Sequence, residues 1–180
     1  MMIDSSPRSP LWNVPYQRNP IFTGQEQTLS QLYKALYAEN SVALSHPQSI
    51  SGLGGIGKTQ TALEYVYRYG ANYEVVFWLQ ADSAATLISG YMALAQTLHL
   101  PEKDNQDQRA IVEAVLRWLR TSKGWLLVFH NLDDFAGVDP LLPKAFRGHI
   151  LFTTRAFAFG SIAQWNCSEF EGEEKRKMLE

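Results

Sequence analysis

The chain has 180 residues with a formal net charge of −2, and 46% of its residues are hydrophobic while 19% are charged. Length and composition predict one globular domain with short appendages, and the small negative charge gives no overall attraction to a nucleic-acid backbone, so no nucleic-acid partner is expected. Apolar runs fall far short of the roughly 20 residues that span a bilayer and no apolar signal segment opens the chain, so we expect a cytoplasmic protein without a membrane partner.

The first elements are predicted from proline content and apolar spacing. Residues 1–18 are proline-rich and predict an N-terminal extension that runs along the surface. From residue 25 to residue 37 apolar side chains recur at helical spacing, which predicts a first helix. Residues 41–51 then indicate a strand that is made irregular by Pro47, and a glycine-rich break follows.

Helices and strands alternate along the rest of the chain. Helices are predicted at residues 58–69 and 108–121, and a further one between them follows a cap at Asp82 or Ser83 and has its apolar face between Leu87 and Leu98. The predicted strands cover residues 75–79, 125–129 and 149–153. Residues 133–140 are rich in turn formers, and residues 167–180 are charged and predict a last helix. This alternation predicts an α/β fold in three layers, with a mainly parallel sheet flanked by helices.

The break between the strand at 41–51 and the next helix carries a phosphate-binding pattern. Residues 52–59 read Gly-Leu-Gly-Gly-Ile-Gly-Lys-Thr, a full match to G-x-x-x-x-G-K-[ST]. Glycines let backbone N–H groups turn toward a phosphate chain, Lys58 reaches the β- and γ-phosphates, and Thr59 offers a hydroxyl to Mg²⁺. A turn that merely joined strand to helix would need neither Lys58 nor Thr59. The expected nucleotide contacts are Gly52, Gly54, Gly55, Ile56, Gly57, Lys58, Thr59 and Gln60, with Thr59 also the expected metal ligand.

Several segments in order resemble the NB-ARC domain of STAND-class P-loop NTPases, which include bacterial and fungal signalling proteins. The carriers are Asn-Pro-Ile-Phe-Thr-Gly-Gln-Glu at 19–26, the tract at 50–59, Trp-Leu-Leu-Val-Phe at 125–129, and Leu-Phe-Thr-Thr-Arg at 151–155. The resemblance divides the chain into the extension at 1–18, an NB-ARC-like nucleotide-binding domain at 19–163, and a charged helix or the start of a further subdomain at 164–180.

The resemblance also implies ligands and roles. Ile21, Phe22 and Thr23 would lie against adenine, and Arg155 would be a sensor arginine that contacts the γ-phosphate. The ligand would be ADP or ATP, whose exchange switches members of the family between a closed state and an assembling state. Protein partners or self-association would follow from such a role.

The sequence departs from the P-loop pattern at His130. The strand at 125–129 should be followed by the Walker B aspartate that holds Mg²⁺, but His130 stands there. Imidazole is a poor ligand for this hard cation, so Mg²⁺ binding is expected to be weakened and ATP hydrolysis to be slow or absent. Asp133 and Asp134 follow, and turn capping is the role expected of them.

Other functions stay open at this point. A pseudo-NTPase that serves as an interaction module, with structural nucleotide or none, is the main alternative because His130 replaces the acid. A GTPase is suggested by Asn131-Leu132-Asp133-Asp134, which imitates a guanine-recognition motif without its lysine. A small-molecule P-loop kinase would need acceptor and lid residues that the sequence does not display.

Overall fold

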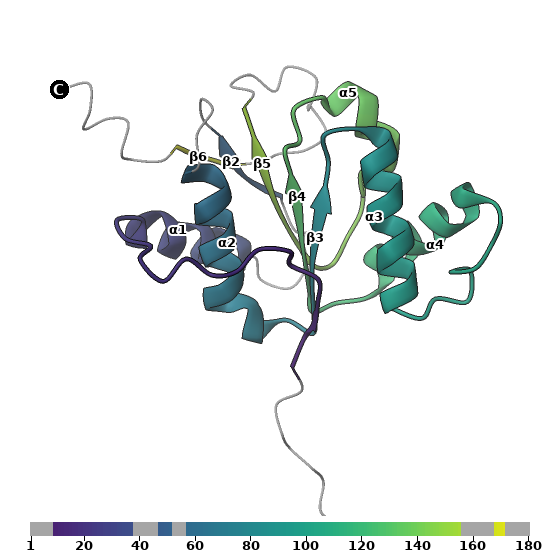
Figure 1. Cartoon of the computed structure of the whole chain (residues 1–180), viewed down its shortest axis with the longest axis horizontal. Coiled ribbons are helices and arrows are strands. Elements are labelled where there is room, and N and C mark those ends of the chain that lie inside the picture. The colour runs from purple at the N-terminus through teal and green to yellow at the C-terminus, as the bar shows by residue number, and fades with distance from the viewer. Residues whose placement is uncertain (1–8, 38–46, 52–56, 156–167, 172–180) are drawn as a thin grey trace, which may run out of the picture.

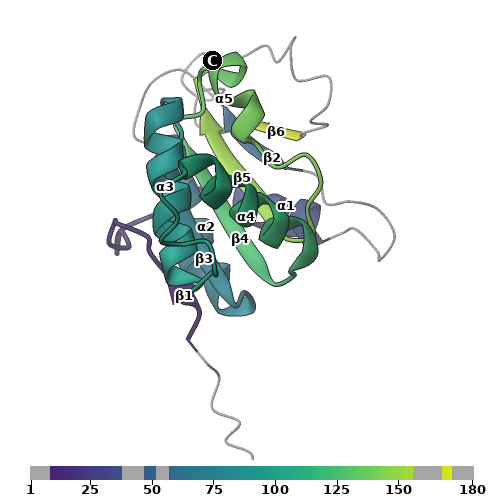
Figure 2. The ribbon, with the colours of Figure 1, turned by 90° about the vertical axis from the view of Figure 1, so that its right-hand side faces the viewer.

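The computed structural model describes residues 9–37, 47–51, 57–155 and 168–171. In these residues six strands form one sheet in the order β1-β3-β4-β5-β2-β6, and every pair of neighbouring strands is parallel (Figures 1 and 2). The strands are β1 Leu11–Trp12, β2 Gln48–Ser51, β3 Val75–Gln80, β4 Trp125–His130, β5 His149–Thr154 and β6 Ser168–Glu171. The buried apolar runs of β3 and β4 are typical of parallel strands that are covered on both faces.

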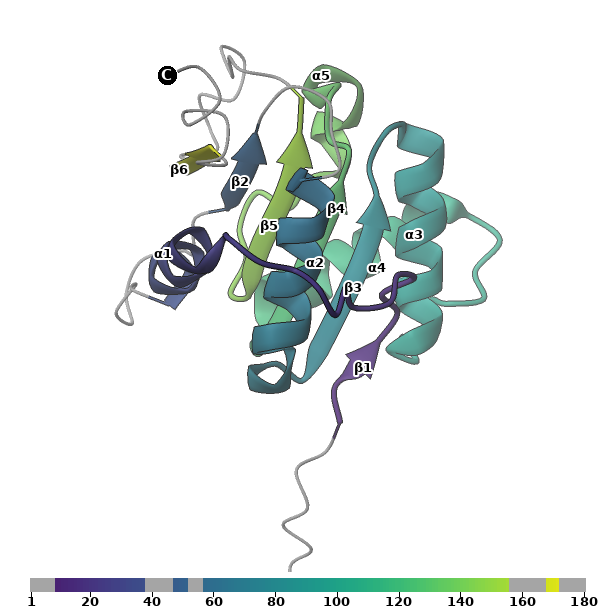
Figure 3. The same ribbon diagram turned by 60° about the vertical axis from the view of Figure 1, so that its left-hand side comes forward.

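Helices cover both faces of the sheet, so the predicted three-layer α/β fold is confirmed (Figure 3). One core joins the apolar faces of α1 and α2 to Val76, Trp78 and Val128, and the other joins α3 and α4 to Phe77, Leu79 and Phe129. Successive residues of β3 and β4 thus alternate between the two cores, as the pleat of a strand requires. The helices are α1 Glu26–Tyr37, α2 Gly57–Tyr69, α3 Ala84–Thr97, α4 Gln108–Thr121 and α5 Phe135–Val138.

Most predicted elements lie where the sequence placed them. Ser83 caps α3 through a capping box with Thr86, and α4 has the predicted bounds. The strand expected over residues 41–51 is described only from Gln48 onward, immediately after Pro47, because residues 38–46 lie outside the described residues.

Two segments differ from the sequence-based expectation. The turn-rich segment after β4 contains the short helix α5, which Asp134 caps by accepting from the Gly137 amide, and a 3₁₀ turn at Asp139–Leu141. Residues 168–171, expected to be helical, form β6 instead and pair with β2. Charge suggested a solvated helix there, but the unpaired backbone groups of β2 offer a strand hydrogen bonds that charge patterning does not reveal.

An extended surface segment is predicted for residues 1–18, and its described part, residues 9–18, lies extended along the surface. It crosses the outer side of α2 (Figure 3), where the ring of Trp12 packs on that of Tyr67 at a centroid distance of 5.3 Å. The Asn13 side chain accepts from the Trp78 amide at 2.6 Å and donates to the Trp78 carbonyl at 3.2 Å, so it continues the pairing of β3 beyond β1. In the described part of the chain, no helix is both long and apolar enough to cross a lipid bilayer.

We expect Gly148→Ala to destabilise the fold, because an added Cβ would lie 2.1 Å from a ring atom of Trp125, which is fully buried. The overpacking should cost about 1–3 kcal/mol in the free energy of unfolding, measured with urea. Gly90→Ala is the matched control: its Cβ meets a methyl of Leu79 at 2.7 Å, a flexible group that can turn aside. Equal stability of the two variants would contradict the prediction.

We also expect a pH dependence from His149, whose Nδ1 lies 2.7 Å from the Tyr73 hydroxyl. Burial lowers the pKa of His149 to about 4. The unfolded chain, with a usual pKa near 6.5, therefore binds a proton that the folded chain does not, and stability should fall by about 2–3 kcal/mol as the pH drops through this window. His149→Gln keeps a hydrogen-bond acceptor but does not titrate, so its urea-unfolding free energy should vary less between pH 6.5 and 4. An unchanged slope would assign the effect to other groups.

Candidate functional site

The first turn of α2 stands at the carboxyl end of the sheet. Residues 52–56 lie outside the described residues, so Gly52, Gly54, Gly55 and Ile56 are not placed. Gly57, Lys58, Thr59 and Gln60 form the first turn, which contains no acidic residue. A Cβ added at Gly57 would meet no atom of the described residues within 4 Å. The positive end of a helix dipole, with a lysine in its first turn, suits an anion.

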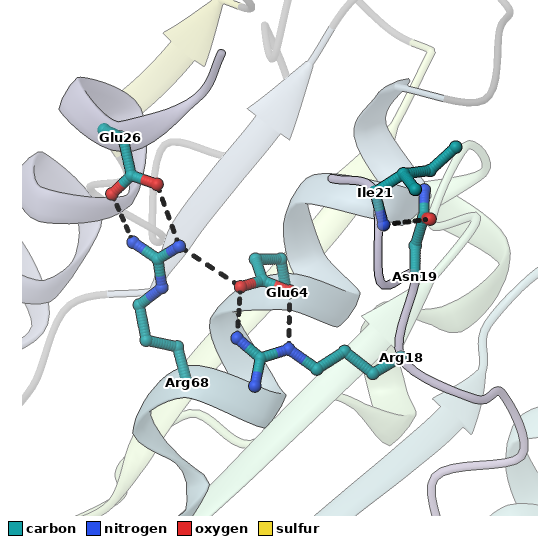
Figure 4. Close-up of polar contacts among 6 residues, drawn as sticks. All are labelled: Arg18, Asn19, Ile21, Glu26, Glu64 and Arg68. Atoms are coloured by element: carbon teal, nitrogen blue, oxygen red, sulfur yellow. Dashed lines mark hydrogen bonds and ion pairs between the residues drawn. The ribbon is translucent and has the colours of Figure 1, made fainter. Parts of the chain in front are cut away.

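A chain of ion pairs fixes α2 to the segment before α1 (Figure 4). The guanidinium of Arg18 binds both carboxylate oxygens of Glu64 at 3.1 and 2.7 Å, and Arg68 bridges Glu64 at 3.2 Å and Glu26 at 2.5 and 3.0 Å. The Glu64 side chain is only 4% exposed, and its hydrogen bonds to Arg18 lower the pKa of its carboxyl. Loss of either arginine would leave this buried charge undercompensated.

The expected adenine contacts lie on the segment that this network holds. The Ile21 amide donates to Asn19 Oδ1 at 3.1 Å, and the Ile21 side chain is 80% exposed (Figure 4). Phe22 is half-buried and packs against the core formed by α1, α2 and the sheet, whereas Thr23 is exposed. The contact of these three residues with adenine remains a prediction.

His130 ends β4 and is joined to both the helix and the neighbouring strand. Its Nε2 lies 3.0 Å from the Thr59 hydroxyl, and its Nδ1 lies 2.9 Å from Gln80 Oε1. Gln80 and His130 are direct partners in the register of β3 and β4. The side-chain amide of Gln80 in turn donates to the Tyr16 hydroxyl at 3.5 Å. Neither Gln80 nor Tyr16 was among the site residues expected from the sequence.

The direction of these hydrogen bonds follows from the chemistry of the groups. Because the carbonyl oxygen of Gln80 only accepts, Nδ1 carries the ring proton, and Nε2 accepts the hydroxyl proton of Thr59. Burial lowers the pKa of His130, an effect that the charges of Asp82 and Asp133 oppose, and the net shift favours the neutral ring. The imidazole therefore supplies neither a negative charge nor a lone pair directed at a ligand.

The residues at this position do not fit Mg²⁺. The ion prefers several oxygen ligands, including carboxylates, whereas Thr59 faces a neutral ring whose lone pair is already engaged. Among the residues that the structure describes, no group of three or more His, Cys, Asp or Glu side chains could hold a metal ion.

Asp133 binds Arg155. The Arg155 amide and Nε donate to the two carboxylate oxygens of Asp133 at 2.7 and 2.8 Å, and the Thr154 hydroxyl donates to the same carboxylate at 3.3 Å. Burial raises the pKa of Asp133, but the bonds from Arg155 outweigh it and lower the pKa. Only Asp134 has the capping role that was expected of both aspartates. Of the predicted site residues, Thr59 and His130 contact each other, whereas Arg155 contacts Asp133.

Comparison with known proteins identifies the family. The model of the NB-ARC domain matches residues 25–174. A nucleotide-binding leucine-rich repeat (NLR)-like protein from Hyaloscypha variabilis is 29% identical over 164 residues, a match that covers 80% of this chain and 16% of the relative.

Comparison with solved structures shows a similarity of fold only. Cdc6p from Pyrobaculum aerophilum superposes with a TM-score of 0.57 at 16% identity, over 88% of this chain and 48% of that one. The Orc1 protein of Aeropyrum pernix, solved in complex with DNA, gives a TM-score of 0.57 at 15% identity, over 92% and 52%. The chain thus spans about half of each solved relative and a smaller part of the fungal one, and by its match over most of its length it belongs to the NB-ARC domain family.

Proposed function

We propose that this domain binds ADP or ATP at the start of α2 and is the nucleotide-binding core of a STAND-type signalling switch that hydrolyses ATP slowly or not at all. The observation that carries the proposal is the first turn of α2, where Lys58 and Thr59 of a complete phosphate-binding pattern stand at the carboxyl end of a parallel sheet. Ligands of open α/β sheets bind at this edge.

Loss of hydrolysis follows from the groups that surround Thr59. A P-loop NTPase uses a carboxylate after this strand to hold the metal that neutralises charge on the phosphates. Here the carboxylate is replaced by His130, which is engaged with Thr59 and Gln80. Asp133 does not replace it, because its oxygens bind Arg155.

Arg155 is the candidate sensor of the γ-phosphate. It follows the last residue of β5, beside the end of β4, and its side chain is 70% exposed. Its Nε binds Asp133 in this structure, so a γ-phosphate would either share the guanidinium with that carboxylate or displace it. Discrimination between ATP and ADP would then depend on the balance between these two anions.

The wider role is a regulated interaction with other proteins or with further copies of the chain, in keeping with the NLR-like name of the fungal relative.

The alternative is a module whose nucleotide, if any, is structural, and the bond between Thr59 and His130 favours it because that bond satisfies both side chains within the protein. A GTPase gains no support, since Asp133 and Asp134 of the imitated motif bind Arg155 and cap α5. The proposal includes no nucleic-acid partner.

The purified protein should release ADP or ATP when it is denatured, and chromatography would identify the nucleotide. Lys58→Ala should weaken the binding of added ADP by about tenfold or more, because the lysine contributes a charge-assisted contact to the phosphates. Lys144→Ala is the control, since that exposed lysine pairs with Asp139 away from α2. Release of GDP would support a GTPase, and the absence of both copurified nucleotide and a melting-temperature shift with ADP would contradict nucleotide binding.

His130→Asp should raise the rate of Mg²⁺-dependent ATP turnover by about tenfold or more, since it restores a hard anionic ligand. Phosphate release from the native chain and the variant, each at saturating ATP, measures the effect. Robust and equal hydrolysis by both proteins would remove the link between His130 and slow turnover.

A further inference from the structure

Thr59, His130 and Gln80 form a hydrogen-bonded network beside the start of α2, and none of these three side chains carries a negative charge. We propose that this hydrogen-bonded network makes nucleotide binding independent of divalent cations, so that the site takes the nucleoside diphosphate or triphosphate as the metal-free anion. The proposal rests on the function proposed above and concerns the same site. It assigns Gln80 as a positioning residue.

Two features of the fold hold the hydrogen-bonded network in place. Parallel register puts Gln80 directly beside His130 at the ends of β3 and β4, and the main chain continues this pairing where the Ala81 amide donates to the His130 carbonyl at 2.8 Å. The ring of Trp78 packs against that of His130 at a centroid distance of 5.4 Å, and His130 is only 7% exposed. The imidazole is therefore restricted by packing as well as by its hydrogen bonds.

The proton positions determine which acceptor atoms and which charge the hydrogen-bonded network presents to a ligand. A carboxylate in place of His130 could accept the hydroxyl proton of Thr59 with one oxygen and keep a second oxygen and a full negative charge for a metal. Imidazole can accept the same proton through Nε2, but its second nitrogen carries a hydrogen that points to Gln80. The bond to Thr59 is kept while the charge is lost.

Loss of the negative charge has two effects, and both reduce the dependence of nucleotide binding on a divalent cation. A carboxylate at this position attracts a divalent cation and repels the phosphates of a nucleotide that has none, so cation and nucleotide assist each other in binding. An imidazole ring has no negative charge, so it removes both the attraction and the repulsion. The positive groups that remain near the phosphates are those of the protein, namely Lys58 and the amides of the first turn of α2.

The test measures the affinity for a fluorescent ADP analogue, methylanthraniloyl-ADP, in EDTA and in excess MgCl₂. The native chain should bind with dissociation constants that agree within about twofold. His130→Asp should bind about tenfold or more tightly with Mg²⁺ than in EDTA, mainly because the new carboxylate repels the bare diphosphate. His130→Asn is the matched control: it has the shape of aspartate without the charge, and its ratio of affinities should stay near one.

The outcomes separate this inference from the proposed function. Saturable binding by the native chain that is about tenfold tighter with Mg²⁺ would overturn the inference and leave nucleotide binding intact. A His130→Asp variant that responds to Mg²⁺ no more than the native chain would overturn it as well. No saturable binding by the native chain in either buffer would contradict the proposed function, and the inference with it.

A second measurement does not depend on folded variants of His130. Long-range ¹H–¹⁵N spectra of the native chain without nucleotide should show the ring as the neutral tautomer with its hydrogen on Nδ1, and Gln80→Leu should remove this preference because it deletes the acceptor. His99 and His149 give reference signals. A charged ring, or a hydrogen on Nε2 in the native chain, would overturn the proposal.

Discussion

The hydrogen bond between Thr59 and His130 joins the first turn of α2 to the end of β4, and the arrangement of the site depends on it. It is possible because parallel strands end at one edge of the sheet, where the helix that follows β2 begins. The same geometry aligns Gln80 with His130 and leaves Arg155, one strand further along, within reach of Asp133. A single edge thus brings together residues from four separate parts of the chain.

Local patterns were sufficient to predict most of the fold. The helical spacing of apolar residues in α4, and the cap of α3 at Ser83, depend on neighbours a few residues away. The strand β6 was not predictable in this way, because it depends on the open edge of β2, which lies more than a hundred residues earlier in the sequence. The short helix α5 was also missed, since its cap at Asp134 uses the same residue types as a turn.

The site could be predicted from the sequence only where a motif fixes residue identity. Thr59 and His130 were recognised from their positions in the P-loop pattern, although nothing in that pattern indicates that their side chains bind each other. Gln80 was missed because its role comes from strand register. One signal was available: β3 and β4 are apolar runs that both end in a polar residue, and adjacent parallel strands bring such ends together. The pairing of Asp133 with Arg155 needed the order of strands, which the sequence alone does not state.

A neutral histidine at the end of β4 has a consequence for any switch built on this domain. Coupling between two ligands is reciprocal, so a nucleotide whose binding is not assisted by a cation cannot in turn recruit one. The third phosphate of ATP could then be distinguished only by groups of the protein. Among the described residues near this edge, Lys58 and Arg155 have the charge for that task, and the guanidinium of Arg155 is already bound by Asp133. A preference for ATP that uses Arg155 would therefore require the guanidinium to be shared between the γ-phosphate and Asp133 or to leave the carboxylate, whereas ADP could bind without disturbing this ion pair.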